Sequence, residues 1–120
     1  MSLDLSGVTI VFDLDGTLVD TAPDLAAAAN HVFGLIGLAP VLPAELHPMI
    51  GRGSRAMIEE GLRLHGVIKT PAEVDRLHKL FFPYYADNIA VLSRPFEGIP
   101  ALLDKLLQAG ARLAVCTNKL

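Results

Sequence analysis

The stretch VTIVFDLDGTLVD, residues 8–20, decides how the rest of this 120-residue chain is interpreted. Its first five residues, Val8–Phe12, are apolar or β-branched and predict a fully buried strand. Asp13 and Asp15 follow at once, and on an extended chain residues two apart point to the same side. Open α/β sheets bind ligands beyond the carboxyl ends of their parallel strands. The two carboxylates are therefore predicted to lie in a binding site.

This acidic loop favours a divalent-cation site with a carboxylate nucleophile. Mg²⁺ prefers oxygen ligands and is commonly held by one or two carboxylates together with water and phosphate oxygens. Asp is a nucleophile in phosphoryl transfer, and a second Asp can act as acid and then as base. A bare Asp-x-Asp also fits a polar turn. A turn does not, however, require two acids directly after a wholly apolar strand, and Gly16 permits a close approach of backbone to ligand.

The segment Asp13–Asp20, DLDGTLVD, closely resembles the first motif of the haloacid dehalogenase-like hydrolases. The resemblance implies a Mg²⁺-dependent phosphatase or phosphomutase on a Rossmann-like core. It implies that Asp13 becomes an aspartyl phosphate, and that Asp15 is the general acid/base whose backbone carbonyl helps to hold Mg²⁺. Both aspartates are expected as catalytic and metal-binding residues, and Gly16 as a substrate-binding residue. True dehalogenases of the family lack the second Asp, so Asp15 favours phosphate chemistry over carbon–halogen cleavage.

Composition limits the classes of protein that the sequence can encode. Hydrophobic residues make up 52% and charged residues 19%, which excludes wholesale disorder. The net charge is −3 and the Lys and Arg residues are scattered, so no nucleic-acid partner is expected. The sequence shows no signal-peptide pattern and no apolar run of about 18 residues, so no membrane partner is expected either. Cys116, the single cysteine, fits a reducing cytosol, and the expected location is cytoplasmic.

Helical signals dominate the segment 21–92. Thr21 is predicted as an N-cap, with a proline in the first turn and Asp24 three residues after the cap. Thr70-Pro71-Ala72-Glu73 is a capping box that opens a later helix, and Pro83 is expected to kink or split that helix. The two tyrosines at 84 and 85 are expected to pack against other helices. The segment is therefore predicted to form a helical subdomain.

Arg52 lies between two glycines in the stretch Gly51–Ser54, and Ser54 is predicted to cap a helix over 55–65. Backbone N–H groups at such a helix start bind anions, and the guanidinium adds a fork of donors. A tight turn with a solvated arginine is the alternative. Arg52 is thus a candidate substrate-binding residue.

The last part of the chain predicts a second strand parallel to the first. Pro100 begins a Leu-rich helix, Gly110 ends it, and Ala111–Cys116 is a buried strand. Strand, insert, helix and strand in this order imply a parallel pair with a long crossover. The predicted fold is α/β, an incomplete Rossmann-like parallel-sheet core with an inserted all-helical cap. The expected parts are 1–20, the cap at 21–92, and 93–120 with the core helix and second strand.

Thr117-Asn118-Lys119, directly after this strand, resembles the second motif of the same family. The resemblance implies that the Thr117 hydroxyl and the Asn118 backbone N–H bind oxygens of the transferring phosphoryl group. The run from Pro95 to Lys119 looks like the phosphoglycolate phosphatase branch, and Thr21–Leu92 looks like that branch's helical cap.

The sequence departs from the family pattern because it stops at Leu120. The family's third motif, a charge-neutralising Lys, and its fourth, an acidic pair for Mg²⁺, both lie further along. Lys119 is not assigned to either motif. The chain is expected to be an N-terminal portion with weak Mg²⁺ binding and little turnover. Its strand edges, Val8–Phe12 and Arg112–Cys116, are expected to pair between chains.

Three functions follow from these patterns. The leading one is a phosphoglycolate phosphatase-like phosphomonoesterase that acts on a small organic phosphate, with the cap closing over the site. A β-phosphoglucomutase-like phosphomutase shares every motif present and differs in transferring the phosphoryl group to a second hydroxyl. A non-catalytic module that accepts phosphate or binds partners through its helices is the alternative outside enzymes.

Overall fold

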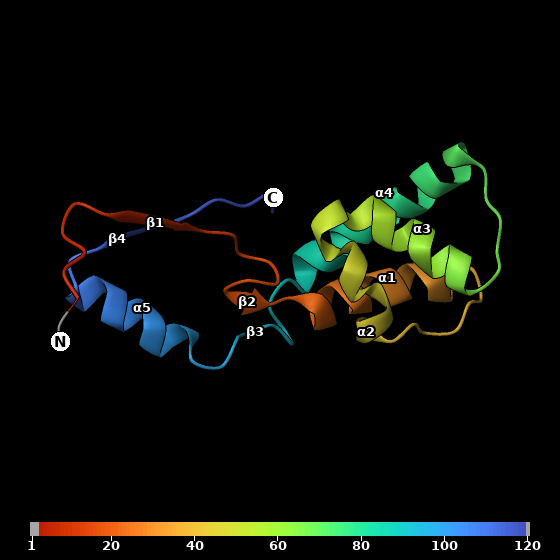
Figure 1. Cartoon of the computed structure of the whole chain (residues 1–120). Helices are drawn as coiled ribbons and strands as arrows, with labels where there is room; N and C mark the ends of the chain where they lie inside the picture. The colour runs from red at the N-terminus through yellow and green to blue at the C-terminus, as the bar shows by residue number, and fades with distance from the viewer. Residues whose placement is uncertain (1–2, 120) are drawn as a thin grey trace. The chain divides into compact units, whose positions relative to one another are not determined.

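The computed structural model describes residues 3–119, which form two compact units. One unit contains the residues up to Asp20 and those from Arg94 onward, and the other is Thr21–Ser93 (Figure 1). The first unit is an α/β structure and the second is helical. None of the helices within residues 3–119 is long and apolar enough to span a bilayer.

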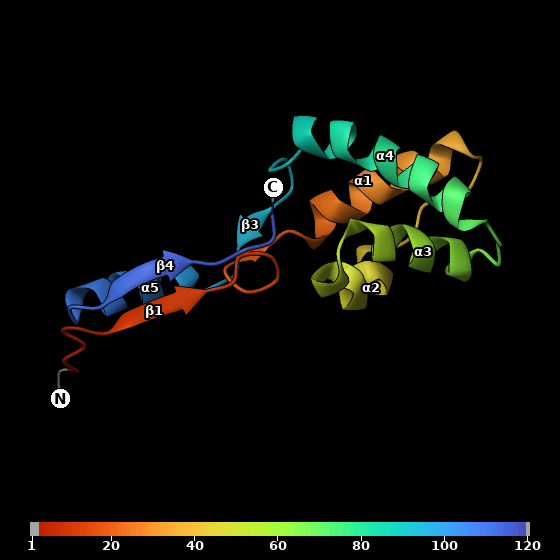
Figure 2. The ribbon, with the colours of Figure 1, turned by 90° about the horizontal axis from the view of Figure 1, so that it is seen from above.

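The α/β unit is built on a pair of parallel strands, β1 (Thr9–Phe12) and β4 (Arg112–Val115). Thr9 pairs with Arg112 and Phe12 with Val115, and the two arrows point the same way in Figure 2. Helix α5 (Ile99–Gln108) precedes β4 and packs against it. The apolar runs therefore do form a parallel pair with a long crossover, and the α/β prediction is confirmed.

The prediction that these two strands are fully buried is wrong. Val11 and Val115 are 59% and 54% exposed. The described sheet has only these two strands, and α5 is the only helix among the described residues of this unit. A strand becomes fully buried only when both faces are covered and both edges are paired.

A second, antiparallel pair was not predicted. Strand β2 (Val19–Asp20) pairs with β3 (Arg94–Pro95), a segment that the sequence indicated only as a link. Phe96 extends the contact by donating its N–H to the Leu18 carbonyl over 3.1 Å. Proline is tolerated in β3 because the ladder is short and lies at an edge. This ribbon joins the two points at which the chain leaves and re-enters the α/β unit.

The helical unit contains α1 (Ala22–Leu35), α2 (Pro43–Leu46), the 3₁₀ helix η1 (His47–Arg52), α3 (Ser54–Leu64) and α4 (Pro71–Asp87). Helix α1 packs against both α3 and α4 (Figure 1). Small residues on α1 make this close contact possible, because Ala28 and Ala29 are fully buried. The largest fully buried side chains are Phe33, Phe81, Leu46, Met57, Ile58 and Val32.

The capping box at the start of α4 is confirmed. The Thr70 hydroxyl accepts the Glu73 N–H over 3.2 Å, and the Glu73 carboxylate accepts the Thr70 N–H over 3.3 Å. Helix α4 continues through Pro83 to Asp87 and is not split. Tyr85 is buried in the core and Tyr84 stacks on His31, so the packing role expected of the two tyrosines is also confirmed.

Of the other two predicted caps, Thr21 is the N-cap residue of α1 as expected, whereas the N-cap of α3 is Gly53 and not Ser54. The Thr21 hydroxyl makes no cap hydrogen bond and is buried without a partner among the described residues. The Asp24 carboxylate instead accepts the backbone N–H groups of Leu92 and Ser93. The Ser54 hydroxyl is 2.6 Å from Nε2 of His78 rather than at the helix end. Asp24 and Ser54 thus bond to residues distant in sequence rather than to the first turn of their own helix.

Candidate active site

The loop after β1 is held in a tight turn by its own backbone. The Leu14 carbonyl accepts the N–H groups of Thr17, Leu18 and Val19 at 3.0 to 3.2 Å. Gly16 has a φ of +74°, a value that disfavours any residue with a Cβ, and its N–H donates to the Val19 carbonyl over 2.9 Å. Leu18 is buried at 6% exposure and anchors the turn. The acidic loop is therefore a defined structure rather than an open connection.

The two aspartates of this loop have different surroundings. Asp13 follows β1 directly, is exposed, and accepts the Leu14 N–H at Oδ1 over 2.8 Å. Asp15 is half-buried, and its Oδ1 lies 3.2 Å from Nζ of Lys119. One carboxylate is thus open to solvent, while the other is held in an ion pair.

The loop after β4 lies at the same end of the strand pair. Cys116 continues the ladder by donating its N–H to the Phe12 carbonyl over 2.8 Å. Thr117 comes next, and its Oγ1 accepts the Lys119 N–H over 3.0 Å, with Asn118 exposed between them. Because the strands are parallel and in register, the ends of both strands open onto the same edge. The predicted residues on 13–17 and 117–118 therefore come from two adjoining loops of one unit.

Arg52 belongs to the other unit. It is exposed at the end of η1, directly before Gly53, which is the N-cap of α3. Its role as a substrate contact stays a prediction.

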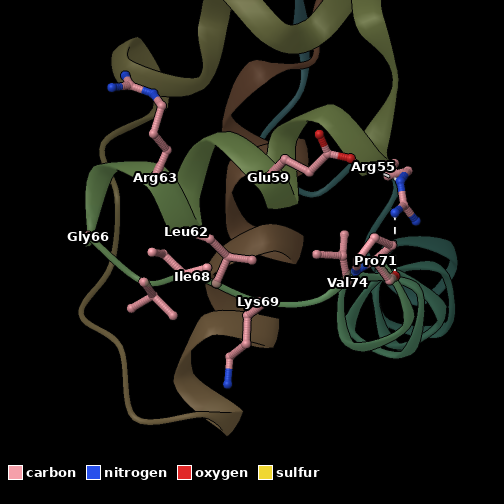
Figure 3. Close-up of a pocket in the computed structure, with 10 residues that line it drawn as sticks. Arg55, Glu59, Leu62, Arg63, Gly66, Ile68, Lys69, Pro71 and Val74 are labelled. Carbon is pink, nitrogen blue, oxygen red and sulfur yellow. Dashed lines mark hydrogen bonds and ion pairs between the residues drawn. The ribbon is translucent and has the colours of Figure 1, made fainter.

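The helical unit contains a pocket of about 630 Å³ between α3, the loop that follows it and the start of α4 (Figure 3). None of the predicted site residues lines it. Its three cationic side chains are paired with acids: Arg55 with Glu59 at 2.9 Å, Arg63 with Glu60, and Lys69 with Glu73 at 3.6 Å. Because these charges are already neutralised, we do not assign the pocket to phosphate binding.

His78 is a partly buried titratable group of the helical unit, and its pKa is perturbed. Burial lowers the pKa of His78 below its usual value of 6.5, and the Arg55 guanidinium lowers it further, whereas Asp75 raises it. The ring bonds to Ser54 on the neighbouring helix. This histidine therefore supports the packing of α4 against α3.

The chemistry of the acidic loop fits a hard divalent cation. Its donors are two carboxylates, and Mg²⁺ typically takes one or two carboxylates and completes its shell with water and phosphate oxygens. Within residues 3–119 no group of three or more His, Cys, Asp or Glu side chains is placed to hold a metal. The donors of this loop are carboxylate oxygens, which a hard divalent cation prefers.

These features define an α/β protein with an inserted helical unit, whose candidate site lies on two loops beyond neighbouring parallel strands. The family model described as haloacid dehalogenase-like hydrolase matches residues 10–120. The chain belongs to this family, as its two sequence motifs indicated.

The chain is similar to several curated phosphatases and to solved structures. A phosphoglycolate phosphatase from Agrobacterium fabrum is 46% identical over 91% of this chain and 47% of its own length. An N-acetylmuramic acid 6-phosphate phosphatase from Pseudomonas aeruginosa is 39% identical over 92% of this chain and 47% of its own length. The crystal structure of a predicted phosphoglycolate phosphatase from Haemophilus somnus has a TM-score of 0.79 and 28% identity, over 99% of this chain and 54% of that one. This chain therefore spans about half the length of the curated relatives it matches.

Sequence reasoning missed Lys119 as a member of this site. Lys119 comes directly after the second motif, yet its side chain reaches back to Asp15 on the first loop. The predicted parallel pairing of the two strands could have indicated this contact, because it brings any residue just beyond β4 close to the acidic loop after β1.

Proposed function

We propose that this sequence encodes part of a Mg²⁺-dependent phosphomonoesterase that is similar to phosphoglycolate phosphatase and acts on a small organic phosphate. The parallel register of β1 and β4, which places Asp13 and Thr117 on adjoining loops, is the observation that carries the proposal. The names of the relatives support phosphate-ester chemistry. Because two phosphatases with different substrates match at similar identity, the sequence favours a substrate class rather than one compound.

The reaction we propose uses the two aspartates in sequence. A carboxylate oxygen of Asp13 attacks phosphorus as the P–O ester bond breaks, and Asp15 donates its proton to the leaving alkoxide. Asp15 then takes a proton from water, whose oxygen attacks the aspartyl phosphate and releases inorganic phosphate. The exposure of Asp13 suits the attacking group, which must reach the substrate, and the ion pair that favours the carboxylate form of Asp15 suits its second role as the base that takes a proton from water.

The remaining loop residues bind the phosphoryl group in this proposal. The Thr117 oxygen already accepts the Lys119 N–H, so its own proton remains available for a phosphoryl oxygen. The backbone N–H of Asn118 and the Gly16 turn supply further contacts. Mg²⁺, when bound at Asp13 and Asp15, would neutralise phosphate charge. The helical unit would act as the cap, with Arg52 as a substrate contact.

The test is hydrolysis by the protein as its cell produces it, with phosphoglycolate and a panel of sugar phosphates, in Mg²⁺ and in chelator. We expect Mg²⁺-dependent phosphate release, loss of turnover by at least about a thousandfold in Asp13→Asn, and normal activity in the control Asp104→Asn on the exposed face of α5. Full activity of Asp13→Asn would remove Asp13 as the nucleophile.

Products distinguish the alternatives. Transfer of the phosphoryl group to a second sugar hydroxyl, without phosphate release, would indicate a phosphomutase. A lasting acyl phosphate at Asp13 after treatment with a small phosphodonor would indicate a non-catalytic acceptor.

Two further proposals concern the chain itself. The 120-residue chain alone is expected to turn over little substrate and to pair between copies, because β1 and β4 expose valine side chains on a two-stranded sheet. We propose a cytoplasmic location because Cys116 is a free and exposed thiol, which a reducing compartment preserves.

A further inference from the structure

Lys119 contacts both loops of the candidate site. Its ammonium lies 3.2 Å from Oδ1 of Asp15, and its backbone N–H donates to the Thr117 hydroxyl over 3.0 Å. The lysine side chain is 15% exposed and that of Asp15 is 23% exposed, so water screens this pair less than a surface ion pair. One residue therefore fixes a carboxylate on the first loop and a hydroxyl on the second.

The contact is not explained by the needs of the fold. Thr117–Lys119 lies beyond the last ladder bond of β4, which Cys116 makes to Phe12. Lys105, the lysine of α5, is exposed, and its side chain makes no such contact within residues 3–119. A lysine that served only solubility would project into water as Lys105 does.

We propose that Lys119 is a positioning residue, which holds the Asp15 carboxylate and the Thr117 hydroxyl in one fixed relative geometry. This inference rests on the proposed function, in which Asp15 transfers protons and Thr117 binds the phosphoryl group. Lys119 itself need not touch the substrate. Its value is that two groups on loops far apart in sequence are aligned before the substrate arrives.

The first measurement needs no catalysis. Three-bond NMR couplings report the χ1 angles of Asp15 and Thr117 in the chain as it exists, with and without Mg²⁺. We expect one dominant rotamer for Asp15 in the wild type and rotamer averaging in Lys119→Met. Lys119→Arg should keep the single rotamer because it keeps the cation, and Lys105→Met removes the same charge elsewhere and should change nothing.

The second measurement is steady-state kinetics of the full-length protein that carries this sequence. We expect Lys119→Met to lower kcat about tenfold or more, with KM changed by less than about threefold, because alignment acts on the transition state. Lys119→Arg should recover at least about a third of kcat, and Lys105→Met should match the wild type.

The outcomes separate this inference from the proposed function. Unchanged Asp15 couplings in Lys119→Met would overturn the inference, even if kcat fell. Averaged couplings with unchanged kcat would overturn it too, since alignment would then have no catalytic use. A wild-type protein that hydrolyses no phosphate ester would refute the proposed function, and the couplings would still decide whether Lys119 orders the two loops.

Discussion

The buried carboxylate of Asp24 joins the first and the last residues of the helical unit through hydrogen bonds. Asp24 lies in the first turn of α1 and is 2% exposed. Its oxygens accept the N–H of Leu92 at 3.0 Å, the N–H of Ser93 at 2.7 Å and the Ser93 hydroxyl at 2.6 Å. These bonds join the residues where the chain enters the unit to those where it leaves. Asp24→Ala removes all of them at once.

The expected cost is large because the bonds are charge-assisted. A hydrogen bond to a charged group contributes about 1.5–3 kcal/mol, and a buried donor that loses its acceptor costs about 1–3 kcal/mol. Leu92 is 54% exposed, so water can replace part of what its N–H loses. We therefore expect Asp24→Ala to lower the free energy of unfolding by about 3–4 kcal/mol, a large share of the roughly 5–15 kcal/mol typical of a domain.

Urea unfolding of the 120-residue chain, followed by far-UV circular dichroism, measures this loss. Ser93→Ala removes the hydroxyl bond to Asp24, keeps the backbone N–H bond, and should cost about 1.5–3 kcal/mol. Asp87→Ala at the exposed end of α4 is the matched control and should change stability by less than about 0.5 kcal/mol. An Asp24→Ala variant within about 1 kcal/mol of wild type would refute the reasoning, because the carboxylate would then not join the two ends.

Three further predictions concern the helical unit. In Gly61→Ala the new Cβ would clash with the ring of the buried Phe33, so we expect a loss of about 1–3 kcal/mol in urea unfolding despite alanine's better helix propensity. Thr70→Ala removes the N-cap hydrogen bond of α4 and should cost about 1 kcal/mol in the same assay. Thr21→Val removes a buried hydroxyl that has no partner among the described residues, and should stabilise the chain by up to about 1 kcal/mol. The pKa of His78 is lowered in the folded chain, so as pH falls the unfolded chain takes up the His78 proton before the folded chain does. The free energy of unfolding should therefore be highest above about pH 6.5 and decrease as pH drops below it. Unfolding free energies measured from pH 7.5 downward should show this slope reduced in His78→Gln, and an identical slope would contradict the assignment.

Local patterns predicted much of the fold. The apolar runs before Asp13 and Thr117 form the strands β1 and β4, and the capping box at Thr70 begins α4 as expected. These features succeed because their causes lie within a few neighbouring residues. The exposure of Val11 could not be predicted in this way, because it depends on what covers the strand rather than on the sequence of the strand itself.

The candidate site shows the same division. The order of the two motifs and the parallel strands indicated that Asp13 and Thr117 lie on adjoining loops. The partners of Asp24 and Lys119 could not be predicted, because each pairs with a residue far away in sequence whose identity carries no local signal. Local patterns predicted Asp24 only as the acid that follows a helix cap. They assigned no role to Lys119.

The pairing of β1 with β4 also has a consequence for the newly made chain. Thr9 leaves the ribosome early, yet its partner Arg112 is synthesised only after the whole of Thr21–Ser93. Closing so long a loop is entropically costly and slow, whereas the helices between are built from nearer contacts. Until that closure occurs, the N-terminal strand has no partner, and chaperones that recognise short apolar segments have their best opportunity to bind it.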